Sequence, residues 1–251
     1  MKLLPLHHAH DIREIMRRWK ALQKAAGLHA TTLTNVEGHP VIAFETKAAR
    51  AGEPAFYLST GVHGDEPGSI WGLLLWAEKN ITKLQRGSFL LLPLLNPIGT
   101  RLNTRADHRG LDINRRFQLT DDPLSAAWQR WIENRAMLAG LCLHEDYDAQ
   151  GCYVYELGHR RATMGHAILA RCAKPIATDP RRRIDGQLAK AGLIRRKKMP
   201  THLPGMPEAI ELHVRGCPLT FTFETPSEFS LDDRVATQMN FIRCALEVIG
   251  A

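Results

Sequence analysis

The sequence predicts an α/β fold in which helices flank a mixed, mainly parallel central sheet on both faces. Apolar strand-like runs alternate along the chain with helix-like runs, which is typical of α/β proteins. The run "SFLLLPLLN" is apolar throughout, as expected for a strand covered on both faces. The 251 residues contain no repeat or low-complexity linker, which favours a single domain over 1–251.

The first half of the chain predicts helices and strands in alternation. Asp11 and Glu14 form a capping-box start for a helix over 12–26, which Gly27 ends. Two strands are expected on either side of a turn at Glu37 and Gly38. A buried strand over 54–61, an almost wholly apolar helix over 68–80 and the apolar strand over 88–96 follow.

The second half is predicted to continue the same alternation after a loop with several arginines. The expected elements are a helix near 123–138, strands over 140–145 and 152–157, a helix over 160–173, a partly helical basic stretch and paired strands over 208–214 and 219–225. Ser230 and Asp233 form a second capping-box start, for a final helix that ends at about residue 249.

Composition narrows the function classes. No apolar run approaches the ~20 residues of a membrane span, and the start of the chain lacks the pattern of a signal peptide, so a cytoplasmic protein is expected. The five scattered cysteines are expected to be reduced thiols. Much of the net charge of +7 lies in 179–200, which matches no nucleic-acid motif. We interpret it as a solvated surface or a lobe near a substrate entrance.

Polar segments follow four of the predicted strands at their carboxyl ends, where open α/β sheets bind ligands. In "GVHGDE", His63 and Glu66 stand three residues apart in a glycine-rich turn, and zinc accepts imidazole nitrogen and carboxylate oxygen. The pair alone also fits chance, or a carboxylate attracted to a helix start. His144, which closes a short apolar strand, is the best candidate for a third ligand.

In the order of these motifs, the chain resembles the zinc carboxypeptidase superfamily, including its succinylglutamate desuccinylase and aspartoacylase branch and the bacterial murein-peptide amidases. The resemblance is carried by "GVHGDE", "NPIGT", "TRADHRGLDINRRF", "LHEDYD" and "TFETPS". It implies a three-layer, zinc-carboxypeptidase-like catalytic domain over 1–251, in which His63, Glu66 and His144 hold one zinc ion per chain. It also implies that Glu224 is the general base and Arg105 the oxyanion stabiliser.

The resemblance further implies that Asn114 and Arg115 bind a substrate carboxylate. The chemistry suits these residue types, because arginine binds a carboxylate through two parallel hydrogen bonds and stabilises a developing oxyanion. Four other residues are weaker candidates for supporting roles around the site: Asp65, Asp112, Asp146 and Tyr155. For Asp112, orienting a neighbouring side chain and simply capping a turn are equally open.

One departure from the superfamily concerns the mobile tyrosine that covers the substrate. The stretch "LIRRKKMPTHLPGMPEA", where this tyrosine is expected, contains none. We therefore expect a zinc-dependent hydrolase that cleaves an amide bond in a small peptide with a free carboxylate, or alternatively an N-acyl amino acid deacylase. Neither a nucleic acid nor a membrane is an expected partner. A remote alternative is a polyanion-binding protein on a degenerate hydrolase fold.

Overall fold

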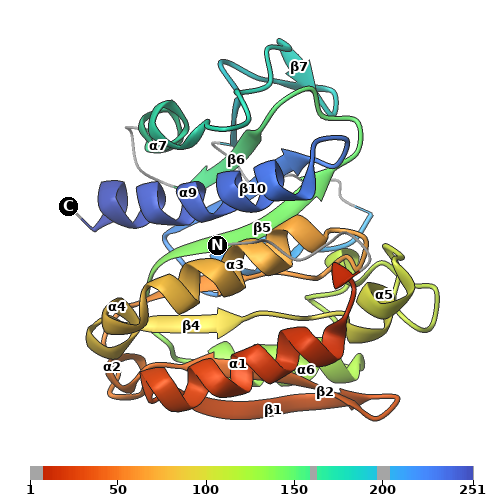
Figure 1. The fold of residues 1–251 in the computed structure, drawn as a ribbon, viewed down its shortest axis with the longest axis vertical. Helices are drawn as coiled ribbons and strands as arrows, with labels where there is room; N and C mark the ends of the chain where they lie inside the picture. Colours follow the sequence, from red (N-terminus) through yellow and green to blue (C-terminus); the bar gives the residue numbers. More distant parts are fainter. Residues whose placement is uncertain (1–7, 159–162, 197–203, 251) are drawn as a thin grey trace.

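The computed structural model describes residues 8–158, 163–196 and 204–250, and within them the central feature is an eight-stranded sheet (Figure 1). Its strand order is β1-β2-β4-β3-β5-β10-β6-β9, and β7 and β8 form a separate small hairpin. The strands are β1 (His29–Val36), β2 (His39–Glu45), β3 (Ala55–Ser59), β4 (Phe89–Leu92), β5 (Met137–Asp146), β6 (Tyr153–Gly158), β7 (Arg183–Ile184), β8 (Gln187–Leu188), β9 (Leu193–Arg196) and β10 (Leu219–Pro226).

The middle of the sheet is parallel and antiparallel pairs lie around it. Strand β3 pairs in parallel with β4 and β5, and β5 pairs in parallel with β10. Antiparallel pairs join β1 to β2, β2 to β4 and β6 to β10. This arrangement confirms the predicted α/β class with a mixed sheet, and it brings the carboxyl ends of β3, β5 and β10 to the same edge.

Helices cover both faces of the sheet. They are α1 (Ile12–Ala26), α2 (Lys47–Arg50), α3 (Pro67–Lys79), α4 (Ile81–Arg86), α5 (Pro97–Leu102), α6 (Pro123–Ile132), α7 (Gly165–Cys172), α8 (Glu208–Val214) and α9 (Leu231–Ile249), with a 3-10 turn η2 (Ile113–Arg115). In Figure 1, α1, α3 and α9 lie in front of the sheet, whereas α6 lies behind it. No helix in the described part of the chain is long and apolar enough to span a bilayer.

Alternating side chains of β3 show why the fold has two cores. Phe56 and Leu58 pack with α1, α3 and α9 on one face, whereas Ala55 and Tyr57 pack with α6 and α8 on the other. Successive side chains of a strand point to opposite faces, so a central strand contributes to both cores. Helix α3 lies against the sheet and contacts α1 and α9, which explains its almost wholly apolar sequence.

Several predicted elements are confirmed together with the chemistry that predicted them. Helix α1 spans 12–26, and the carboxylate of Asp11 accepts the N–H groups of Arg13 and Glu14. At the turn between β1 and β2, Glu37 and Gly38 both have positive φ, as a tight hairpin requires. Ser230 caps α9 through the N–H of Asp233.

Three predictions about secondary structure were wrong. Residues 208–214 form the helix α8 and not a strand. The segment is short and every residue from Glu208 to His213 is buried, so its mixture of polar and apolar residues fits a helix as well as a strand. The helix predicted to reach residue 138 ends at Ile132, since β5 already begins at Met137. The basic stretch, predicted as partly helical, forms β7, β8 and β9 up to residue 196 and lies outside the described residues beyond it.

Candidate functional site

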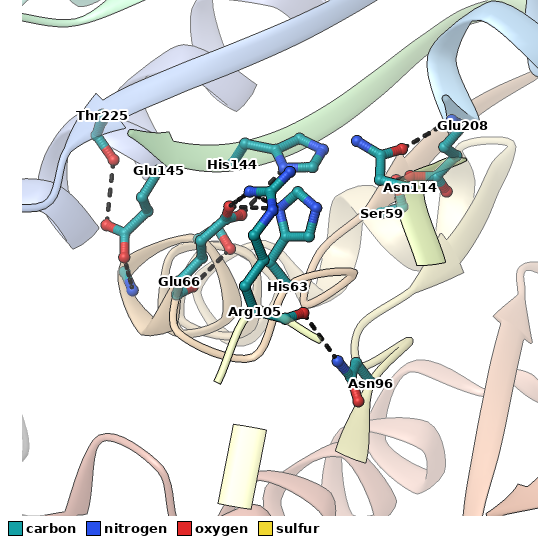
Figure 2. A network of polar contacts seen from close by, with 12 residues as sticks. Ser59, His63, Glu66, Asn96, Arg105, Asn114, His144, Glu145, Glu208 and Thr225 are labelled. Atoms are coloured by element: carbon teal, nitrogen blue, oxygen red, sulfur yellow. Dashed lines mark hydrogen bonds and ion pairs between the residues drawn. The ribbon is translucent and has the colours of Figure 1, made fainter. Parts of the chain in front are cut away.

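The three predicted metal ligands lie together at the carboxyl edge of the sheet. His63 and Glu66 come from the turn between β3 and α3, and His144 comes from the end of β5. One ligand atom from each residue lies within 4.8 Å of the others, and the three residues are only 2 to 3% exposed. Figure 2 shows both imidazoles directed toward the Glu66 carboxylate.

Backbone geometry fixes the His63 turn. Gly61 has a φ of +65°, which side-chain-bearing residues adopt with strain, and this conformation turns the chain sharply after β3. A Cβ atom on Gly64 would lie 1.9 Å from the carbonyl carbon of Gly99, so only glycine lets the two loops meet. The turn therefore requires glycine at both positions for different reasons.

His144 is held by its strand and by α9. It is in register with Glu224 on the neighbouring parallel strand β10, so both side chains leave the sheet on the same face. The side-chain amide of Gln238 donates to the His144 carbonyl at 2.7 Å. The next residue, Glu145, forms a buried 2.7 Å ion pair with Arg234, which ties β5 to α9 behind the site.

The donor set fits a divalent cation. Nδ1 of His63 lies 2.6 Å from Oε1 of Glu66, and Nδ1 of His144 lies 3.0 Å from Oε2, so a proton or a cation must lie between each pair. Oε2 is buried and has no well-directed hydrogen bond within the described residues. Two imidazole nitrogens and one carboxylate are also a common set of protein ligands for catalytic zinc.

The charges at this cluster support one another. Burial opposes the protonated form of His63, but the carboxylates of Glu66 and Asp112 outweigh burial and raise the pKa of His63 to about 9. Burial alone would raise the pKa of Glu66, yet His63 and His144 lower that pKa to about 2. Glu66 is therefore a carboxylate at neutral pH, the form that binds metals.

Asp112 contacts His63 on the side away from Glu66. Its Oδ1 lies 3.2 Å from Nε2 of His63, which is the hydrogen bond that would leave Nδ1 free to bind a metal. Burial opposes ionisation of Asp112, but the bond to His63 lowers its pKa well below the usual range. Of the two interpretations left open for Asp112, the contact favours the orienting one, although its carboxylate also caps η2.

Arg105 reaches the same cluster from the loop after α5. Its guanidinium donates to Oδ2 of Asp112 at 3.0 Å and lies 3.2 Å from Nδ1 of His63. The side-chain amide of Asn96 donates to the Arg105 carbonyl and so holds this loop in place. The Arg105 side chain remains 48% exposed, which leaves it accessible to a ligand beside the predicted metal position.

Asn114 and Arg115 form another wall of the same cavity. Oδ1 of Asn114 accepts the backbone N–H of Glu208 at 2.9 Å, and within the described residues the NH₂ group of this amide has no acceptor. In Figure 2 this nitrogen points from Asn114 toward the two histidines. Nη1 of Arg115 donates to the Asn114 carbonyl at 2.8 Å, which fixes the guanidinium beside the amide.

Glu208, which sequence reasoning missed as a supporting residue, is 1% exposed behind Asn114. Its carboxylate accepts the hydroxyls of Tyr57 and Ser59, and Tyr57 in turn accepts the indole N–H of Trp128. Burial raises the pKa of Glu208. This network fastens the start of α8 to β3, and it could not be predicted while α8 was taken for a strand.

The predicted general base, Glu224, lines the same cavity and is in register with His144 on the neighbouring strand. Burial raises the pKa of Glu224 well above its usual value, His144 opposes the rise, and the charges of Glu66 and Asp146 add to it. Its Oε2 atom is buried and has no hydrogen-bond partner among the described residues. An unpaired carboxylate oxygen in such a place is costly unless a ligand or ion meets it.

All of the predicted metal, catalytic and carboxylate-binding residues line one cavity of about 480 Å³. Of the weaker candidates, Asp146 and Tyr155 also line it, and the Tyr153 hydroxyl donates to Asp146. Asp65 is exposed and is not among the lining residues. The tyrosine-free stretch lies partly outside the described residues, and the phenols lining the cavity come instead from Tyr147, Tyr153 and Tyr155.

Two charged lining residues were missed by sequence reasoning, namely Asp185 and Arg196. Both belong to the basic stretch 179–200, where the many arginines and lysines masked Asp185. The dipeptide Asp185–Gly186 was an available signal, because Asp-Gly is a preferred sequence for a two-residue hairpin turn.

A mixed α/β sheet with two histidines and a glutamate at its carboxyl edge is typical of a metal-dependent hydrolase. The chain belongs to the succinylglutamate desuccinylase/aspartoacylase family, because residues 53–179 match the model of that family's catalytic domain. The matched range includes all three predicted metal ligands, His63, Glu66 and His144, and the match confirms the predicted branch of the superfamily.

Solved structures share the fold over nearly the whole chain. A proposed metallopeptidase from Shewanella amazonensis SB2B is 20% identical with a TM-score of 0.85, over 96% of this chain and 94% of that one. One from Shewanella denitrificans OS217 is 22% identical with a TM-score of 0.83, over 95% and 90%. A metallo-carboxypeptidase from Burkholderia cenocepacia is 16% identical with a TM-score of 0.70, over 95% and 69%. No curated protein sequence matches the chain.

Proposed function

We propose that the protein cleaves an amide bond in a small peptide that carries a free carboxylate, with one zinc ion held by His63, Glu66 and His144. The observation that carries this proposal is the convergence of these three ligands with Glu224, Arg105, Asn114 and Arg115 in one cavity. Zinc bound there would supply Lewis acidity, which polarises an amide carbonyl and makes water a stronger acid.

Glu224 is the proton carrier in this proposal. Its side chain lines the same cavity as the metal ligands, and Oε2 has no described partner that would have to be displaced before a proton is accepted. A carboxylate in this position takes a proton from the attacking water and returns it to the leaving amine. A positive charge beside Glu224 favours its ionised form, and this opposes the effect of burial, which raises its pKa.

Arg105 stabilises the negative charge that develops on the attacked carbonyl oxygen. Its guanidinium is already fixed by Asp112 beside His63, so little reorganisation is needed during the reaction. The exposed half of the side chain leaves donors free for this oxygen.

Asn114 and Arg115 bind the substrate carboxylate. The free NH₂ end of Asn114 and the guanidinium of Arg115 offer several N–H donors along one wall of the cavity. Such charge-assisted hydrogen bonds fix both the position and the direction of an anionic substrate.

A second candidate function is deacylation of an N-acyl amino acid, which the family match favours. The same metal ligands and the same proton carrier serve both reactions. The candidates differ in which side of the scissile amide bears the anchored carboxylate, and a panel of short peptides and N-acyl amino acids separates them.

Metal analysis of the purified protein tests the proposal directly. We expect about one zinc ion per chain in the wild type and a loss of most of it in His63→Ala, because one ligand is removed. Glu224→Gln is expected to keep its zinc and to lose turnover, since the amide cannot accept a proton. Full activity of Glu224→Gln would refute the assignment of the base, and a metal-free wild type that hydrolyses amides would refute the zinc site.

A further inference from the structure

The hairpin of β7 and β8 places a carboxylate at the wall of the cavity. The strands pair in register at Arg183 with Leu188 and at Ile184 with Gln187, which leaves Asp185 and Gly186 as the two turn residues. Both turn residues have positive φ, as this tight turn requires. Ile184 is 1% exposed and packs with Tyr153 and Ile194, so the hairpin is anchored beside the sheet.

Tyr155 fixes the direction of the Asp185 side chain. The phenol donates to Oδ2 of Asp185 at 2.7 Å, and Tyr155 itself projects from β6 into the cavity. The guanidinium of Arg196 lies 5.3 Å from the centre of the Tyr155 ring, stacked on it, and it forms no ion pair with Asp185. Within the described residues Asp185 has no salt bridge.

The charges of the cavity come from different elements. The donors of Asn114 and Arg115 belong to η2, in the loop before α6, whereas Asp185 belongs to the hairpin of β7 and β8, and Figure 1 shows β7 at the top of the molecule. Asp146 and Glu224 add two further carboxylates to the lining. In addition to burial, the negative charges of Asp146 and Asp185 both raise the pKa of Glu224. Arg196, over the ring of Tyr155, adds a cation to the described lining.

We propose that Asp185 is a specificity-determining residue that binds a cationic group, an ammonium or a guanidinium, on a substrate whose carboxylate is held by Asn114 and Arg115. This inference rests on the proposed function and refines its substrate class. A substrate with opposite charges at its two ends matches the cavity, as a short peptide with a free amino group or a basic side chain does. An N-acyl dicarboxylic amino acid presents only negative charge and is repelled at the hairpin.

Four matched dipeptides test the inference and separate the two sources of the cation. Alanyl-lysine, alanyl-norleucine and their N-acetyl forms differ only in the α-ammonium and in the side-chain ammonium. We expect kcat/KM in the wild type to be about 10 to 100-fold higher for a peptide with the recognised cation than for N-acetyl-alanyl-norleucine, the range of a charge-assisted hydrogen bond. A preference lost on acetylation identifies the α-ammonium, and one lost with norleucine identifies the side chain.

Asp185→Asn is the decisive variant, because asparagine keeps the turn conformation and the hydrogen bond to Tyr155 but removes the charge. We expect the preference to fall to within about threefold of parity. Glu53→Gln removes an exposed charge before β3, at the opposite end of that strand from the site, and is expected to leave the preference intact.

The outcomes distinguish this inference from the proposed function. Hydrolysis of all four peptides at similar rates, or a preference that survives Asp185→Asn, overturns the inference alone. If no peptide is hydrolysed, the proposed function fails, and calorimetric binding of the same peptides then decides the inference. Tighter binding of a cationic peptide that depends on Asp185 supports it, and equal affinities overturn it.

Discussion

The two ends of the cavity are built differently. At the metal-ligand end, His63 contacts Glu66, Asp112 and Arg105, and the three ligands are almost completely buried. At the hairpin end, Asp185 is exposed and its described contact is one phenol. Residues with many buried partners fix reacting groups precisely, whereas exposed loop residues can change without loss of the fold. We therefore propose that the sheet fixes the reacting groups and that the appended hairpin sets the specificity.

The strongest test of this contrast compares two adjacent carboxylates on the same turn. Glu66→Ala removes a buried ligand and is expected to abolish zinc binding and to lower kcat/KM at least about 1,000-fold, since a catalytic metal contributes several kcal/mol. Asp65→Ala, one residue earlier and exposed, is expected to retain zinc and most of the activity. Metal analysis and turnover measured on both variants check the prediction, and equal losses in the two would break the contrast.

A milder substitution, at Asp112, tests how far zinc binding at the buried end depends on the contacts that support the ligands. Asp112→Asn removes the negative charge beside Nε2 of His63 but keeps a similar shape. We expect zinc affinity to fall about 10 to 100-fold, as for other residues that orient a metal-binding histidine. Competition with a zinc chelator measures the affinity. An unchanged value would mean that Asp112 serves only as the cap of η2.

The residues of the metal-ligand end could be found from the sequence because local signals mark them. Glycines at 61 and 64 flank His63, an apolar strand precedes it, and His144 closes another such strand. The register of β5 and β10, which brings Glu224 beside His144, follows from parallel pairing and not from any local pattern. For Glu224, the family resemblance supplied what periodicity could not.

The hairpin end could not be predicted for physical reasons. Strands β7 and β8 have two residues each, too few to show any alternation, and their neighbours are mostly arginines. Six of the seven residues of helix α8 are buried, Glu208 and Glu211 among them, so no exposed polar face marked its period. As a result, the link from Glu208 to Asn114 and the position of Asp185 required the tertiary structure.

Asp122 extends the comparison to the loop that carries Arg115. Its carboxylate caps α6 and binds Arg109 and Arg116, and the side chain is only 3% exposed. We expect Asp122→Ala to lower the free energy of unfolding by about 2–4 kcal/mol, from the lost cap and the lost charge-assisted hydrogen bonds. Urea denaturation measures this, and a loss below about 0.5 kcal/mol would contradict the ordered role of the loop.

The same residue predicts a pH dependence. Burial opposes ionisation, but the bonds to Arg109 and to the N–H of Ser125 lower the pKa of Asp122 below its usual value of 3.8. A lowered pKa stabilises the folded state above that usual value, and the stabilisation is lost as the pH falls through the folded pKa. The wild type should therefore lose more stability below about pH 4 than Asp122→Ala does, and parallel unfolding curves would contradict this.

The smallest effect is expected at the hairpin, where Asp185→Asn should change the free energy of unfolding by less than about 0.5 kcal/mol. Asp185 is exposed, and asparagine tolerates the positive φ of 48° at this position and can still accept the Tyr155 hydroxyl. Urea denaturation of this variant beside Asp122→Ala compares two aspartates in one experiment. Because hydrolysis depends on the buried end, a specificity change in Asp185→Asn without a stability change would separate the two ends. A loss of stability comparable to that of Asp122→Ala would instead make the hairpin part of the folded core, and any change in preference would then have a structural cause.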